Sequence, residues 1–87
     1  MNLDPTTNIT VPQKPDTLVS SSSISGYTYD SKQYILDVWF KSSKGKETIY
    51  RYFLIYPTMF AQIFNSGAGI GKKAQKTLKG LRYMKLR

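Results

Sequence analysis

The sequence predicts a single α+β domain: a small three-stranded antiparallel meander followed by two short helices, preceded by an extended N-terminal arm. Three observations predict this class. Residues 24–56 contain three runs rich in aromatic and β-branched side chains, separated by polar turn clusters. Residues 57–81 instead repeat apolar side chains at helical spacing. A chain of 87 residues has room for one hydrophobic core, so we expect an arm over 1–18 and a domain over 19–87.

The arm is rich in proline, threonine and asparagine. Pro5, Pro12 and Pro15 exclude a regular helix in this segment, because proline lacks a backbone N–H and restricts the residue before it. Such an arm is mobile when free, so order in it would indicate that a partner holds it.

Three strands are expected at residues 24–30, 34–40 and 48–56. The first ends at the turn-forming run Asp30-Ser31-Lys32-Gln33, and a polar loop that contains Gly45 joins the second strand to the third. All three runs favour strands because β-branched and aromatic side chains pack well on a pleated surface. Short strands joined by turns predict antiparallel pairing between chain neighbours.

The third strand is apolar on both faces, which is unusual in so small a chain. In the second strand, Leu36, Val38 and Phe40 share one face, whereas Trp39 lies on the other. We expect helices to cover one face of the third strand, and a loop or another protein surface to cover the other. Left bare, this strand would expose an aromatic stripe formed by Tyr50, Tyr52 and Tyr56.

Two helices should follow the strands. Pro57 fits the first turn of a helix and Gly67 ends it, and the residues between them place Met59, Phe60, Ile63 and Phe64 on one face. Residues 72–87 begin with a basic amphipathic helix that ends near Gly80. Its apolar stripe is formed by Ala74, Leu78 and Leu81, with lysines opposite. Tyr83, Met84 and Leu86 are then expected to dock back on the sheet.

Charge is distributed unevenly along the chain, whose net charge is +8. Residues 1–47 sum to zero, whereas residues 48–87 contain Lys and Arg but no acid. Such a field attracts nucleic acid, acidic lipid or an acidic protein face. The chain has no Cys and no His, so the usual nucleophile and the usual acid–base group are missing. We therefore expect no enzymatic activity, no cofactor, no metal site and no small-molecule substrate.

Several short motifs resemble the KTSC family, small domains named for a C-terminal extension of some lysyl-tRNA synthetases. The resemblance covers about residues 19–83. It rests on Ser21, Ser22 and Ile24, on Tyr29-Asp30, on Leu36, Val38 and Phe40, on Tyr50-Arg51-Tyr52-Phe53 with Pro57, and on Leu78 and Tyr83. One departure is Gly69-Ile70-Gly71, where the family has Ser-x-Gly. The resemblance implies a small α+β domain with no known enzymatic activity, found in bacteria and bacteriophages and suggested to bind RNA.

Two functions follow from these observations. The leading hypothesis is a non-enzymatic virion component of a bacteriophage, a minor capsid, decoration or connector protein, that binds an acidic surface of other virion proteins or of its own copies. The alternative is a module that binds RNA or single-stranded nucleic acid. Neither a signal peptide nor a membrane span is expected. In both hypotheses the candidate binding residues are Trp39, Arg51, Tyr52, Lys72, Lys73, Lys76, Lys79 and Arg82.

Overall fold

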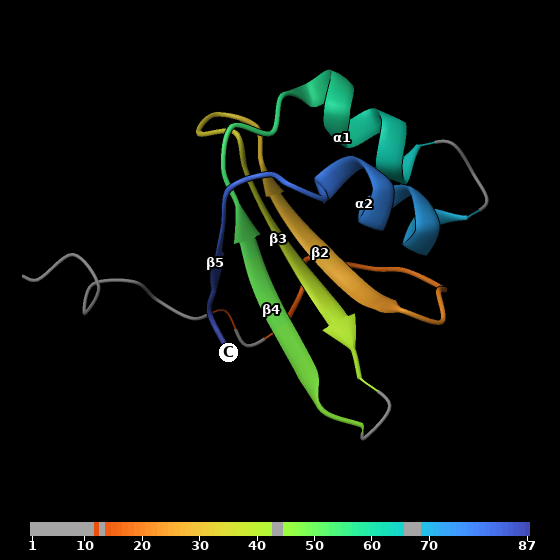
Figure 1. The fold of residues 1–87 in the computed structure, drawn as a ribbon. Helices are drawn as coiled ribbons and strands as arrows, with labels where there is room; N and C mark the ends of the chain where they lie inside the picture. Colours follow the sequence, from red (N-terminus) through yellow and green to blue (C-terminus); the bar gives the residue numbers. More distant parts are fainter. Residues whose placement is uncertain (1–11, 13, 43–44, 66–68) are drawn as a thin grey trace, which may run out of the picture.

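The computed structural model describes residues 12, 14–42, 45–65 and 69–87, which form one antiparallel sheet and two helices (Figure 1). The sheet has five strands whose spatial order, β1-β2-β3-β4-β5, is also their order in the chain. The α+β class is confirmed, but the expectation of three strands is wrong. The elements are β1 (Thr17–Leu18), β2 (Ile24–Asp30), β3 (Ile35–Lys41), β4 (Glu47–Tyr52), α1 (Pro57–Phe64), α2 (Ile70–Leu78) and β5 (Tyr83–Lys85).

The first two predicted strands are confirmed as β2 and β3. The turn between them forms because the Asp30 carboxylate accepts hydrogen bonds from the backbone N–H groups of Lys32 and Gln33, at 2.9 and 3.2 Å. Within the sheet, Asp30 lies opposite Ile35 next to the turn, and the same register continues along both strands to a bulge near Gly26. This register decides which side chains reach each face.

The third predicted strand, 48–56, is shorter than expected: β4 ends at Tyr52. Leu54 has φ 60°, a left-handed conformation that does not continue a strand. The chain turns there, and the backbone N–H of Ile55 donates to the carbonyl of Tyr34 at 2.8 Å. Ile55 is thereby buried in the core instead of extending the sheet.

The sequence patterns missed the two edge strands because they are only two and three residues long. β1 pairs with β2, so the last two residues of the predicted arm belong to the sheet, whereas residues 1–11 and 13 lie outside the described residues. β5 pairs with β4. Two further bonds join Ile49 to the backbone of Leu86 and Arg87, at 2.8 and 3.2 Å. The predicted docking of residues 83–86 on the sheet therefore takes the form of an edge strand.

Both helices lie on one face of the sheet (Figure 1). α1 begins at Pro57 as predicted and ends at Phe64; Gly67, the expected stop, is outside the described residues. α2 ends at Leu78, and Gly80, with φ 84°, then turns the chain toward β5. The core beneath the helices consists of Ile24, Leu36, Val38, Tyr52, Ile55, Ile63, Ala74 and Leu78.

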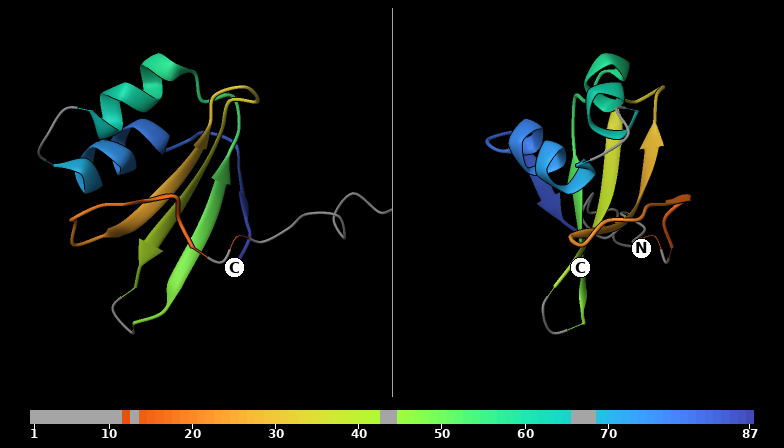
Figure 2. Two further views of the ribbon diagram at one scale, coloured as in Figure 1. Left: turned by 180° about the vertical axis from the view of Figure 1, so that it is seen from behind. Right: turned by 90° about the vertical axis from the view of Figure 1, so that its right-hand side faces the viewer.

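The opposite face of the sheet also buries large side chains, although neither helix covers it (Figure 2). Trp39 and Ile49 lie opposite each other in the register and are fully buried. Pro15 packs directly on Gly26, where a methyl group would also come within 2.6 Å of the carbonyl of Thr17. The chain that leads into β1 therefore covers part of this face. Because Ile49 and Tyr52 are buried on different faces, the apolar character of both sides of β4 is explained.

Candidate functional site

A groove of about 390 Å³ lies between α2 and strands β4 and β5. The sheet contributes aromatic side chains to it, and the helix contributes one polar and one charged side chain beside small or apolar ones. The turn at Gly80 brings β5 back against β4 and so closes one end. The lining residues that matter here are Phe40, Tyr50, Tyr52, Tyr83, Gln75 and Lys79.

The tyrosines of the groove form a contiguous cluster. The ring centroid of Tyr83 is 5.0 Å from that of Tyr50 and 5.9 Å from that of Tyr52. Their exposure differs sharply: Tyr52 is 7% exposed, whereas Tyr83, on the edge strand, is 58% exposed. Burial raises the pKa of Tyr52 to about 12, so its hydroxyl is neutral near pH 7. The cluster therefore has a buried floor and an open ring at its mouth.

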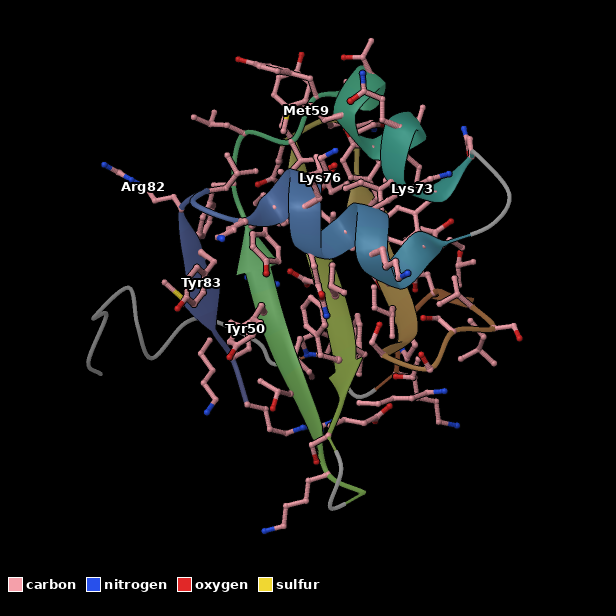
Figure 3. The ribbon with its side chains drawn as sticks, turned by 45° about the vertical axis from the view of Figure 1, so that its right-hand side comes forward. Tyr50, Met59, Lys73, Lys76, Arg82 and Tyr83 are labelled. Carbon is pink, nitrogen blue, oxygen red and sulfur yellow. The ribbon has the colours of Figure 1, made fainter. Side chains whose placement is uncertain are left out.

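One basic side chain, Lys79, lines this groove, and others lie on the neighbouring elements. Lys72, Lys76 and Lys79 are exposed, and their spacing of four and three residues places them on one side of α2 beside Gln75. Arg82 lies in the turn that enters β5, and Figure 3 shows it above Tyr83 and Tyr50. Lys85 follows Tyr83 by two residues, so both point to the same face of the sheet.

None of these cations is neutralised by an acid in the part of the chain that the structure describes. The ion pairs there join Asp37 to Arg51 and Glu47 to Arg87. Asp30 is used in the turn after β2. The groove side of the molecule therefore has uncompensated positive charge next to the exposed ring of Tyr83.

Of the eight predicted binding residues, two line this groove, Tyr52 and Lys79. Lys72, Lys76 and Arg82 are exposed on or next to α2 but do not line it. Lys73 lies on the other flank of α2, about 120° round the helix from Lys79, and is half-buried. Trp39 and Arg51 are not brought to the groove. Trp39 is fully buried on the opposite face, and Arg51, on that same face, donates two hydrogen bonds to Asp37, at 2.8 and 2.9 Å.

Residues that sequence reasoning did not select as binding residues are Tyr50, Gln75, Tyr83 and Lys85. The alternation of side chains along a strand would have found one of them, Tyr50. Arg51 and Tyr52 are consecutive in a strand and so point to opposite faces, whereas Tyr50 shares the face of Tyr52. Tyr83 carried no comparable signal, because a three-residue strand leaves no clear pattern.

The serine segment before β2, residues 21–23, meets Gly71 at the start of α2. A methyl group on Gly71 would clash with the hydroxyl of Ser23 and would lie 3.1 Å from that of Ser21. Glycine at this position therefore lets the helix lie close to the serine segment before β2. The site is a packing contact that orients α2 above the groove.

The groove offers cationic and aromatic side chains. Across the described residues, no group of acidic side chains is placed to hold a metal ion. Within the same residues, no helix is both long enough and apolar enough to cross a membrane. No model of a known protein family matches this chain, and no curated protein matches it either.

Proposed function

We propose that this protein is a small non-enzymatic module that binds single-stranded RNA or DNA along the groove between α2 and strands β4 and β5. The observation that carries the proposal is the combination, on one face, of uncompensated cations with a tyrosine cluster whose outer member, Tyr83, is exposed. Proteins that bind single strands combine a basic groove with aromatic side chains on which bases stack.

The charges of α2 favour a polyanionic partner. Lys72 and Lys76 are four residues apart, and Lys76 and Lys79 are three apart, so each pair destabilises an isolated helix by about 0.2–0.5 kcal/mol. Lys72 also lies in the first turn, where the helix dipole disfavours a cation. Bound phosphates would offset both effects, and none of the described acids does so.

The test is the salt dependence of binding, measured by the fluorescence anisotropy of labelled single-stranded RNA and DNA. Replacing Lys72, Lys76 and Lys79 by Gln should lower the slope of log affinity against log salt by up to about 2, because each phosphate contact on a single strand contributes about 0.7. The matched control replaces Lys14, Lys32 and Lys46, which are exposed elsewhere, by Gln. An equal loss in the control, or no salt-dependent binding by the unmodified protein, contradicts the proposal.

A second candidate is a bacteriophage virion component that binds an acidic protein surface, and a separate exposed apolar patch favours it. Leu54 is 65% exposed, Tyr56 49% and Tyr34 36%, and the rings of Tyr34 and Tyr56 lie 4.7 Å apart. Exposed apolar patches mark protein contacts. Changing Leu54 and Tyr56 to Ser should abolish incorporation into particles but leave affinity for RNA and DNA unchanged. Normal incorporation of this variant would argue against the assembly role.

A further inference from the structure

The groove is lined mainly by aromatic and apolar side chains, with Gln75 and Lys79 among them. We propose that it holds one unpaired nucleobase stacked on the ring of Tyr83, so that the module selects single strands by their exposed bases and uses its lysines only for the flanking phosphates. This inference rests on the proposed function and specifies which part of the ligand the groove recognises.

Tyr83 is placed to act as the stacking platform. It belongs to β5, the edge strand, so one side of its ring meets β4 and the other has no neighbouring strand. On the inner side, the Tyr50 ring is inclined at 64° to it, an edge-to-face contact that fixes its orientation. Tyr83 lines the groove and 58% of the residue is exposed, so part of its ring remains available at the open end of the groove.

The floor of the groove is apolar and the rim is polar, as a base requires. Phe40 of β3 and the buried residues Ala74 and Leu78 of α2 line the apolar part of the groove, whereas Gln75 and Lys79 line its exposed rim. Both Gln75 and Lys79 are exposed. An amide such as that of Gln75 offers both a donor and an acceptor to the edge of a base. A flat ring with a polar edge therefore matches this lining better than a phosphate group does.

Charge is placed to receive the phosphates on either side of such a base. Lys79 lines the groove itself, Arg82 follows in the turn, and Lys85 lies on the same strand face as Tyr83. None of them is paired with an acid in the described part of the chain. A base on Tyr83 would thus be flanked by cations along the direction from α2 to the end of β5.

These features favour a single strand over a duplex. In a duplex each base is stacked between its neighbours and its face is closed to a protein side chain, whereas a single strand presents base faces for aromatic stacking. Cations alone would bind both forms, because their contacts with phosphates do not depend on the bases. The tyrosines are therefore what confers selectivity.

The experiment compares a single-stranded thymidine oligonucleotide, an abasic strand with the same number of phosphates, and a duplex of equal length. The unmodified protein should prefer the thymidine strand over the other two. Tyr83→Ala should weaken binding of that strand by about 5-fold to about 100-fold, the range expected for loss of one stacked base. Tyr83→Phe should retain binding, because it keeps the ring. The abasic strand should bind equally to all three proteins.

Tyr56→Ala is the matched control, since Tyr56 is also an exposed tyrosine but lies outside the groove. It should leave all affinities unchanged. Emission from Trp39, the chain's one tryptophan, which is buried on the other face, verifies that each variant is folded.

The two proposals fail in different ways. If the abasic strand binds as tightly as the thymidine strand, or if Tyr83→Ala weakens both strands equally, base stacking is overturned while salt-dependent phosphate binding stands. If neither strand binds and poly(L-glutamate) does, nucleic-acid binding itself is overturned.

Discussion

The two faces of the sheet use similar side chains in opposite ways. On the face away from the helices, Arg51 is held by two hydrogen bonds to Asp37, and Trp39 is fully buried. On the helix face, Tyr83 is mostly exposed, and Lys79 has no acidic partner among the described residues. The comparison teaches that an aromatic residue beside a cation does not itself mark a binding site. The proposed site differs by an exposed aromatic ring and by a cation that has no acidic partner among the described residues.

The largest expected effect comes from removing the buried ring. Trp39→Ala should destabilise the protein by about 3–5 kcal/mol, because a large cavity replaces a side chain that is fully buried. A domain of this size has little stability to lose, so this variant is expected to be unfolded at room temperature. Circular dichroism with urea titration measures the change.

Tyr83→Ala provides the counterpart on the other face. Its ring is mainly exposed, so the free energy of unfolding should fall by less than about 1 kcal/mol. Equal losses from Trp39→Ala and Tyr83→Ala would refute the distinction between a structural face and a binding face.

Breaking the ion pair between Asp37 and Arg51 should give the next largest loss of stability. Asp37 is 4% exposed, so Asp37→Ala should cost about 2 kcal/mol by leaving the Arg51 guanidinium without its charged acceptor. The hydrogen bond to Asp37 also raises the pKa of Arg51, which keeps this side chain charged. Lys79→Ala, which removes an unpaired cation, should change stability by no more than about 0.5 kcal/mol. A double-mutant cycle with Arg51→Ala measures the coupling, and an energy near zero would argue against a structural role for the pair.

The stability of the protein should fall at alkaline pH because of Tyr52, which is buried on the helix face. Burial raises the pKa of Tyr52 from 10.0 to about 12, so between these pH values the unfolded chain loses this proton and the folded chain keeps it. Its contribution to stability is therefore complete below pH 10 and is lost as pH rises toward 12. Urea midpoints measured across this range should fall more steeply for the unmodified protein than for Tyr52→Phe. Parallel curves for the two proteins would show that Tyr52 is not buried as described.

The smallest effect concerns the turn that ends β4. Leu54 has φ 60° and is 65% exposed, so it bears backbone strain and makes few contacts. Leu54→Asn should stabilise the protein by about 0.5–1 kcal/mol, because asparagine adopts the left-handed region more readily. Thermal unfolding measures the gain, and a loss would indicate that the leucine side chain packs in the folded state.

Long patterned segments were predictable from the sequence, and short or long-range features were not. β2, β3 and the start of α1 have clear periodicity or a turn signal, and they lie where expected. β4 ends early because Leu54 has a positive φ, and a leucine in the sequence gives no indication of such a backbone angle. The groove depends on β5, which pairs with β4 although both helices lie between these two strands in the sequence. Trp39 and Arg51 resemble the binding residues in type, but strand alternation puts both on the face opposite Tyr52.

The order of the strands has a consequence for how the protein folds. β2–β3 and β3–β4 pair across the short connections 31–34 and 42–46, whereas β4–β5 must close the segment 53–82. Closing a longer loop costs more entropy, about 0.6 kcal/mol for each doubling of its length. The hairpins should therefore form early and the last strand late. In a refolding reaction, Trp39 would be sequestered before the tyrosine groove exists, so competence to bind would lag behind acquisition of the central sheet.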